Sequence, residues 1–163
     1  MKEATIWFKN PLAIYAKNSK GGVVIKGQEI IELVGSGKTP LSQIDEVYDA
    51  SKSVVLPGLI NTHHHFYQTL TRAYPEALNK ELFSWLKSLY KVWAHIQPEM
   101  LAVSTELALS ELLLSGCTTA SDHHYLFPDQ LENAIDIQVE QAQKLGMRVV
   151  LTRGSMRLGE KDG

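Results

Sequence analysis

Residues 57–68 read Pro-Gly-Leu-Ile-Asn-Thr-His-His-His-Phe-Tyr-Gln, and the residues at 54–56 before them are all apolar. Apolar, β-branched residues at this point predict a buried strand that ends near the histidines. Because residues two apart along a strand point to the same side, we expect His63 and His65 to project together, with His64 facing away. Two imidazoles on one face of a strand end supply half of a four-ligand metal site. We therefore predict that His63 and His65 bind one divalent metal, with zinc expected and iron as the alternative.

The residues after position 53 alternate between strand and helix patterns. Three apolar segments are predicted to be strands: 54–60, 118–122 and 147–152. One helix is expected to run from Pro98 to Gly116 and another from Asp129 to Gly146. Proline suits the first turn of a helix, and glycine suits its end. A shorter amphipathic helix is expected over residues 81–90. The order strand, helix, strand, helix, strand favours a parallel sheet with crossover connections.

Residues 1–53 read instead as short strands joined by turns. The expected strands are 5–8, 12–15, 23–26 and 30–34. Gly27 and Gln28 are the expected hairpin turn between the last two strands. The stretch from Gly35 to Lys38 is too short for a phosphate-binding loop, because the remaining glycine spacing and the following helix are missing.

The composition narrows the class of partner and compartment. A formal net charge of −2 gives no electrostatic reason to expect nucleic-acid or membrane partners. The single cysteine, Cys117, excludes an intrachain disulfide and fits a reducing compartment. No stretch approaches the roughly 18 apolar residues of a membrane span. We expect a cytoplasmic protein.

The histidine motif also carries a resemblance to a known family. Residues 57–65 resemble the first-strand motif of the amidohydrolase superfamily, whose HxH pair binds a catalytic divalent metal. The continuation over 66–72 is similar to the deaminase and chlorohydrolase branch. Within that branch, residues 122–128 and 153–156 make the chain most similar to 8-oxoguanine deaminases. The resemblance covers essentially the whole chain.

This resemblance implies a particular fold. The family folds as a metal-dependent (β/α)₈ TIM barrel preceded by a small β-sandwich, and such barrels need about 250 residues. With 163 residues, the chain is expected to be the N-terminal portion of a larger protein. Residues 1–53 would be the N-terminal part of the sandwich. Residues 54–163 would be the first three strands and two helices of an incomplete barrel.

The resemblance also implies a reaction, hydrolytic deamination of an aminated purine-type heterocycle, with 8-oxoguanine the expected substrate. Triazine dechlorination and deamination of an adenosine-type nucleoside are alternatives on the same scaffold, and a truncated, non-catalytic chain is a third. The family's proton-shuttling glutamate follows a third histidine as H-x-x-E, and this sequence contains no H-x-x-E. We therefore assign no catalytic residue within the chain and expect residues 1–163 alone to be inactive. Whether the whole protein is a homo-oligomer is left open.

Four residues are candidates for contact with the small-molecule substrate. The Gln68 amide both donates and accepts, as a purine edge requires, although a solvated loop glutamine is the alternative. Arg72 suits a carbonyl or carboxylate, or equally a surface ion pair. Trp85 either stacks on a flat ring or packs against its own helix. Since neighbours on a strand alternate sides, only one of His123 and His124 can face the pocket, and we take His123 as the candidate.

Overall fold

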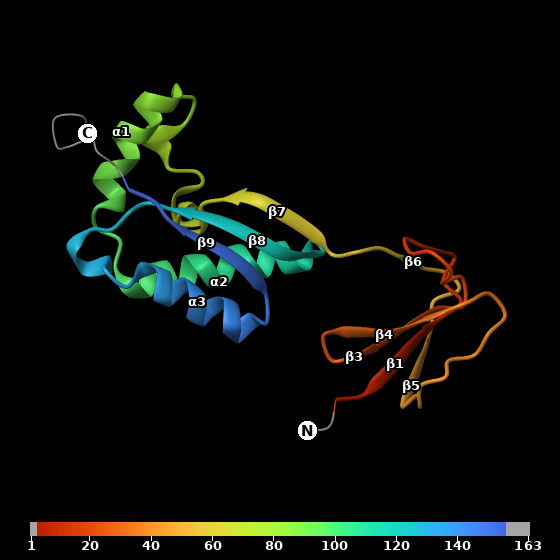
Figure 1. The fold of residues 1–163 in the computed structure, drawn as a ribbon. Coiled ribbons are helices and arrows are strands. Elements are labelled where there is room, and N and C mark those ends of the chain that lie inside the picture. The colour runs from red at the N-terminus through yellow and green to blue at the C-terminus, as the bar shows by residue number, and fades with distance from the viewer. Residues whose placement is uncertain (1–2, 156–163) are drawn as a thin grey trace. The chain divides into compact units, whose positions relative to one another are not determined.

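The computed structural model describes residues 3–155. The chain separates into two compact units on either side of the bond between Pro57 and Gly58 (Figure 1). Within the described part of the chain, no helix combines the length and apolar character that crossing a membrane requires.

The first unit contains a four-stranded sheet with the strand order β4-β3-β1-β5. Its strands are β1 (Thr5–Lys9), β3 (Gly22–Lys26), β4 (Glu29–Val34) and β5 (Glu46–Asp49). β1 is antiparallel to β3 and parallel to β5. β3 and β4 form the expected hairpin around Gly27, whose φ of 55° is readily adopted by glycine. The strand β5 was not predicted, because all four of its residues are exposed and show no alternation of buried and exposed positions.

A second, two-stranded parallel sheet joins β2 (Ala13–Ile14) to β6 (Val54–Val55). On the larger sheet, Trp7 and Val24 are paired and buried in a small core. The next pair along, Phe8 and Val23, belongs to the opposite face and lines an open apolar cavity of about 520 Å³. Both sheets contribute side chains to this cavity.

The strand predicted over residues 54–60 is wrong as a single element. Residues 54–55 pair within the first unit, and a separate strand, β7 (Leu59–His64), begins the second unit. Pro57 has no amide hydrogen to continue a ladder. At Gly58 the chain approaches the strand β8 (Cys117–His124) so closely that a Cβ atom would lie 2.1 Å from Thr118 Oγ1. The apolar residues 54–60 are thus divided between a sheet of the first unit and a sheet of the second.

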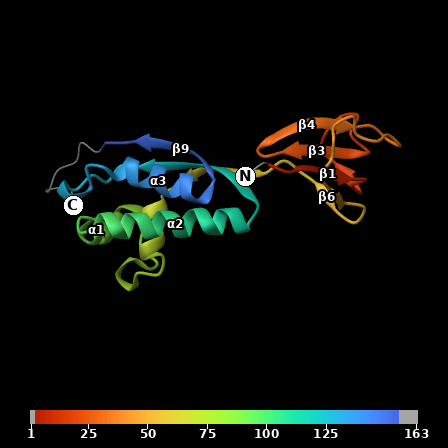
Figure 2. The same ribbon diagram turned by 90° about the horizontal axis from the view of Figure 1, so that it is seen from below.

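The second unit is built on a parallel sheet with the order β7-β8-β9, as the alternating pattern predicts. The two further strands are β8 (Cys117–His124) and β9 (Arg148–Arg153), and the helices are α1 (Leu82–Trp93), α2 (Pro98–Leu114) and α3 (Ala134–Leu145). Three short 3₁₀ turns complete it: η1 (Phe66–Thr71), η2 (Pro75–Ala77) and η3 (Asp129–Leu131). Helices α2 and α3 lie on the same face of the sheet (Figures 1 and 2).

The helix boundaries follow local chemistry with one exception. Pro98 occupies the first turn of α2, and Gly116 has a φ of 85° just after its end. Gly146 closes α3 in the left-handed conformation. The exception is the start of α3, predicted at Asp129. Residues 129–131 form a separate 3₁₀ turn instead, and the α-helix begins at Ala134.

Two apolar clusters hold the second unit together. One lies between the sheet and helices α2 and α3, and consists of Phe66, Ala108, Leu109, Cys117, Ala120, Ala142 and Met147. The other is rich in aromatic side chains and packs α1 against the segment after β8. Its largest members are Tyr67, Trp93, Leu89, Leu101 and Leu131. The second cluster surrounds the end of the sheet at which the histidines lie.

Candidate metal centre

The end of β7 is irregular where the histidines begin. Along the ladder with β8, Asn61 pairs with Ala120 and His64 pairs with Asp122, so β7 contains one extra residue between these pairs. The side-chain oxygen of Asn61 accepts the backbone N–H of His63 at 3.0 Å. An extra residue of this kind re-aims the side chains that follow it.

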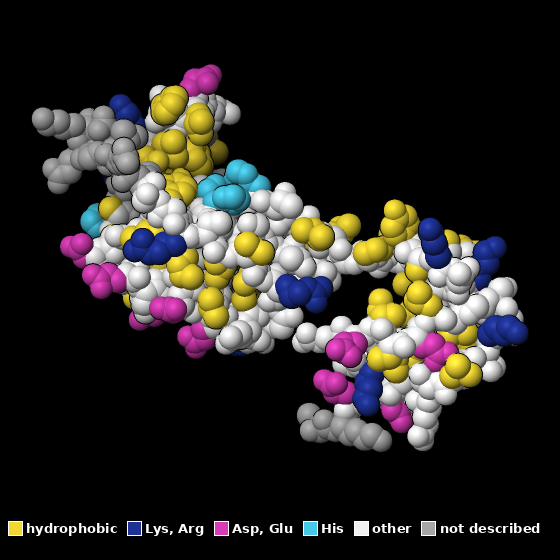
Figure 3. Space-filling model, viewed as in Figure 1, with side chains coloured by type: hydrophobic (Ala, Val, Ile, Leu, Met, Phe, Trp, Pro, Cys, Tyr) yellow, Lys and Arg dark blue, Asp and Glu magenta, His cyan; other side chains and the backbone are white. Residues whose placement is uncertain are grey.

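Three imidazole rings meet beyond this irregularity. The ring centroids of His63 and His65 are 5.2 Å apart, and His123 from β8 lies 4.8 Å from His63 and 5.9 Å from His65. Histidine side chains gather visibly on the surface of the second unit (Figure 3). The structure therefore brings the two predicted ligands together. Their role in binding a metal stays a prediction.

His64 has a different environment. Its ring packs against Phe66 at 5.1 Å, and its Nδ1 atom is buried without a hydrogen-bond partner. Burial lowers the pKa of His64. It nevertheless shares the rim of one open cavity with His63 and His65.

A backbone contact fixes the hydrogen position on His65. Its Nδ1 atom lies 2.7 Å from the carbonyl oxygen of His123. Because a carbonyl can only accept, Nδ1 carries the hydrogen and Nε2 keeps a free lone pair. Burial lowers the pKa of His65, which favours the neutral imidazole that binds metals.

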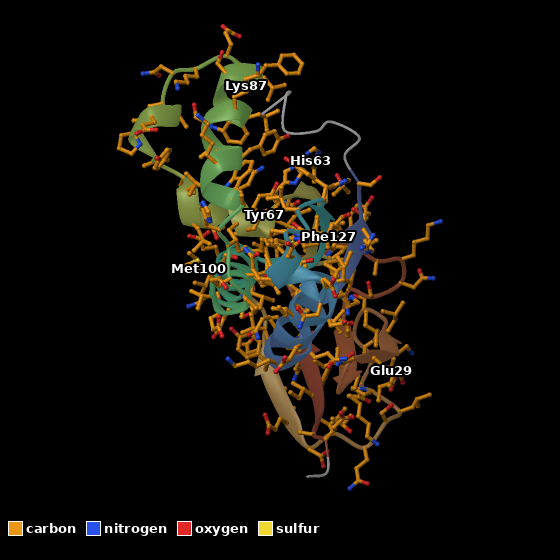
Figure 4. All side chains as sticks on the ribbon, turned by 90° about the vertical axis from the view of Figure 1, so that its left-hand side faces the viewer. Glu29, His63, Tyr67, Lys87, Met100 and Phe127 are labelled. Carbon is orange, nitrogen blue, oxygen red and sulfur yellow. The ribbon has the colours of Figure 1, made fainter. Side chains whose placement is uncertain are left out.

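The register of β8 decides which of its two histidines joins this group. His124 is only 1% exposed, and its Nε2 atom donates to the carbonyl oxygen of Leu126 at 2.7 Å. Its ring packs edge-on against Tyr67 (5.4 Å) and Phe127 (5.0 Å), both labelled with His63 in Figure 4. His123 is half-buried and lies beside His63. One histidine of the pair therefore belongs to the core and the other to the site.

An open cavity of about 500 Å³ adjoins the three consecutive histidines. Its other lining residues include three of the four predicted substrate contacts, namely Gln68, Arg72 and Trp85. His123 is not among them. It lines a second, smaller cavity of about 370 Å³ with Tyr90, Tyr125 and Thr152.

The three substrate candidates in the first cavity differ in their present contacts. The Gln68 amide lies 3.5 Å from the Tyr67 hydroxyl, which is the limit of a hydrogen bond. Trp85 packs edge-on against Trp93 at 5.5 Å and also faces the cavity. Arg72 donates from both terminal nitrogens to the carboxylate of Glu111, so it takes part in a surface ion pair. This ion pair lowers the pKa of Glu111. A substrate role for any of the three stays a prediction.

Asp122 is the polar residue that sequence reasoning missed. It is fully buried, and its two carboxylate oxygens accept the Phe66 backbone N–H and the Gln138 side-chain amide, each at 2.7 Å. Burial raises its pKa to about 6. An acidic residue within the strand Cys117–His124 is the one signal in the sequence, because a buried carboxylate requires partners.

The donor set fits part of a metal site. His63 and His65 are adjacent imidazoles, and at least His65 has a free Nε2 lone pair. Among residues 3–155, no group of three or more histidine, cysteine, aspartate and glutamate side chains is arranged to hold a metal ion. If the pair binds a metal as predicted, further ligands are required to complete its coordination.

Imidazoles at the carboxyl ends of parallel strands, beside an open cavity, are typical of metal-dependent enzymes of the α/β class. The sequence comparison agrees with this class and makes it specific. Residues 54–163 match the model of the Amidohydrolase family. The chain belongs to the amidohydrolase family, which confirms the resemblance found in its sequence.

Two relatives show where in the family the chain lies. It is 59% identical over 160 residues to the 8-oxoguanine deaminase of Pseudomonas aeruginosa, an alignment that covers 96% of this chain and 36% of the relative. It is 36% identical over 143 residues to the 5-methylthioadenosine/S-adenosylhomocysteine deaminase of Syntrophomonas wolfei, covering 86% of this chain and 30% of that enzyme.

A solved structure shares the fold. The atrazine chlorohydrolase of Arthrobacter aurescens, determined in complex with zinc, superposes with a TM-score of 0.79 at 26% identity, over 97% of this chain and 37% of that one. The chain thus spans about a third of the length of the relatives it matches. The motif segment at 153–156 ends at Met156, which lies outside the described residues.

Proposed function

We propose that the whole protein is a metal-dependent hydrolase that releases ammonia from an aminated purine-type heterocycle, with 8-oxoguanine as substrate. The observation that carries the proposal is 59% identity to an 8-oxoguanine deaminase across 96% of this chain. The adjacent imidazoles of His63 and His65, at the mouth of an open cavity, support it.

The proposed ligands of one divalent metal are His63 and His65, with zinc the expected ion and iron the alternative. A related structure that contains zinc supports this choice. When bound, such a metal lowers the pKa of water toward neutrality and so supplies hydroxide for attack on a ring carbon. The chain's own contribution is twofold: burial favours the neutral ring of His65, and the contact of Nδ1 with the His123 carbonyl keeps the hydrogen on Nδ1, so that Nε2 stays free.

The proposed substrate contacts surround this pair. Gln68 would read the edge of the heterocycle, because within residues 3–155 its side-chain amide has a single, long hydrogen bond, to the Tyr67 hydroxyl. Trp85, half-buried at the cavity, would stack on the flat ring. Arg72 would hold a substrate oxygen only by giving up its ion pair with Glu111. His123 would approach the substrate from the side of the second cavity.

We propose further that the sheet β7-β8-β9 is the start of a (β/α)₈ barrel and that residues 1–53 are part of a β-sandwich. Parallel strands with helices on one face, and candidate site residues at the carboxyl ends of the strands, support the barrel. The remaining metal ligands and the proton-shuttling glutamate would come from residues beyond this sequence. A cytoplasmic location and a homo-oligomeric state stay predictions.

One experiment separates the proposed reaction from its alternatives. The whole protein is incubated with 8-oxoguanine, an adenosine-type nucleoside and a chlorinated triazine, and the release of ammonia and of chloride is measured. We expect ammonia from 8-oxoguanine at the highest kcat/KM. Chloride release, or preference for the nucleoside, would favour one of the alternatives on the same scaffold. No release from any of the three would favour the non-catalytic chain.

A further inference from the structure

The carboxylate of Asp122 joins three elements of the second unit. It lies in the central strand β8, and one oxygen accepts the N–H of Phe66 at the start of η1. The other oxygen accepts the side-chain amide of Gln138 on α3. Both distances are 2.7 Å and both groups are buried, as is typical of strong hydrogen bonds to a charged acceptor.

This carboxylate acts next to the proposed ligand His65. Phe66 is the residue after His65, and His123, whose carbonyl accepts from the His65 ring, is the residue after Asp122. Two consecutive residues of β8 therefore hold the two residues that directly follow β7. We call this pair of hydrogen bonds the strand clamp. One bond fixes the backbone and the other fixes the ring.

The strand clamp determines what the imidazole can offer. With the backbone after His65 fixed, the ring stays within reach of the His123 carbonyl, and Nδ1 keeps its hydrogen. Without the Asp122 contact, the Phe66 N–H would be buried and unpaired, and the turn that starts at His65 would shift to find another acceptor. The ring could then leave the carbonyl and adopt either neutral tautomer.

Gln138 gives the carboxylate a fixed direction. It donates to the oxygen that does not contact Phe66, and its own Oε1 atom is buried with no hydrogen-bond partner. An asparagine at 122 could still accept the Phe66 N–H. After rotation of the Gln138 amide, it could also donate to Oε1. The site therefore offers a conservative replacement that keeps both connections.

We propose that Asp122, oriented by Gln138, is a positioning residue that holds the proposed metal ligand His65 in the tautomer whose Nε2 faces the metal. This inference rests on the proposed metal-dependent function. Groups that hydrogen-bond directly to a metal-binding histidine change metal affinity by about 10- to 100-fold when they are removed, and Asp122 acts one step further out, through the backbone at Phe66, so we expect the lower end of that range.

The test uses the whole protein with Asp122→Ala, Asp122→Asn and Gln138→Leu, and Gln143→Leu as a control on an exposed residue of the same helix. Zinc affinity is measured by competition with a chromophoric chelator. We expect a loss of at least about tenfold for Asp122→Ala and a smaller loss for Gln138→Leu. Asp122→Asn and the control should remain within about threefold of wild type, because both connections survive or are untouched.

A second readout needs no metal. In protein labelled with ¹⁵N-histidine, freed of metal and held near pH 8, where imidazole is neutral, ring ¹⁵N shifts report the tautomer of His65. We expect Nδ1–H in wild type and in Asp122→Asn, and a mixture in Asp122→Ala. If Asp122→Ala does not fold, Gln138→Leu takes its place. A mixture of His65 tautomers in Gln138→Leu supports the positioning role, and the wild-type tautomer with wild-type zinc affinity contradicts it.

The two readouts distinguish the inference from the function on which it rests. If wild type binds no zinc through His63 and His65, the proposed metal site is wrong, while the tautomer still tests the positioning role. If Asp122→Ala retains the wild-type tautomer and zinc affinity and loses only thermal stability, Asp122 is structural and the inference is overturned.

Discussion

The ends of β7 and β8 both carry consecutive histidines, but the side chains have different environments on the two strands. Within residues 3–155, β7 pairs with β8 alone, and its Leu59 and Ile60 are 58% and 68% exposed. β8 is the central strand, and its residues alternate between buried and half-buried along its second half. As a result, β8 buries His124 almost completely and places only His123 beside the rings of His63 and His65, whereas all three histidines at the end of β7 line one cavity.

This difference indicates a division of labour between neighbouring strands. The central strand contributes groups that fix position, namely the Asp122 carboxylate and the His123 carbonyl. The strand β7 contributes the groups that are held. The extra residue between Asn61 and His64 changes the direction of the side chains that follow it in β7, whereas β8 keeps an unbroken register with β9 from Thr119 to His124.

The largest effect, on both strands at once, is expected when the protein is made as residues 1–163 alone. Made alone, residues 1–163 should release no ammonia from 8-oxoguanine, because only two of the proposed ligands are present and H-x-x-E is absent. The apolar edges of the sheet should also promote association. Ammonia assays and thermal unfolding check both points. A cooperative, zinc-bound monomer that releases ammonia would contradict the prediction.

The next largest effect should distinguish the histidines of β7 from one another. In the whole protein, His63→Ala or His65→Ala should remove both bound metal and activity, because each would take away a ligand. His64→Ala should retain much of each, since that ring packs against Phe66. Metal content per chain and turnover are the measurements. Equal metal loss in all three variants would count against the assignment.

On β8 the expected loss is one of stability. His124→Ala removes a buried ring between Tyr67 and Phe127, together with its bond to the Leu126 carbonyl. We expect a decrease of about 2–4 kcal/mol in the free energy of unfolding, measured by denaturant titration. His123→Ala should cost much less, and a result in the reverse order would show that the two side chains have been assigned to the wrong environments.

The contribution of His124 to stability should also depend on pH. Burial lowers the pKa of His124 below its ordinary value, so the unfolded chain takes up a proton at a higher pH than the folded chain. The stability that His124 contributes is complete above the ordinary imidazole pKa of about 6.5 and is lost as the pH falls through the folded pKa. The difference in stability between wild type and His124→Ala should therefore shrink toward acid pH.

The smallest predicted effect concerns the cavity beside β7. If Gln68 reads the substrate edge, Gln68→Ala should lower kcat/KM by at least about tenfold, or ~1.4 kcal/mol, with metal content unchanged. Thr69→Ser is a suitable control, because it retains the hydroxyl that donates to the Phe66 carbonyl. Unchanged kinetics for Gln68→Ala would return this residue to the status of a solvated loop glutamine.

Periodicity and helix-end residues predict the regular part of this fold. The parallel order of the strands, the start of α2 at Pro98 and the end of α3 before Gly146 all follow from local patterns. The division of the apolar run at Pro57 does not, because the choice between two sheets is made by partners distant in sequence. The exposed strand β5 has no apolar pattern to reveal it.

At the site, alternation along a strand predicts that only one of His123 and His124 faces outward, and the structure selects His123. The partners of Asp122 could not be predicted. They come from residues 56 positions before it and 16 after it, and no local pattern encodes such contacts. The extra residue in β7 could not be predicted either, because it is defined only by the pairing of β7 with β8, which is distant in sequence.

The sequence separations between Asp122 and its two partners, Phe66 and Gln138, also have a consequence for the order of folding. Closing a loop of 56 residues costs about 1 kcal/mol more in chain entropy than closing one of 16, because the cost grows with the logarithm of length. The contact between β8 and α3 should therefore form first, and β7 should dock onto a βαβ unit of β8, α3 and β9 that already exists. Assembly of the histidine group would then be among the last events in the second unit, so capture of a metal would report that the chain has finished folding.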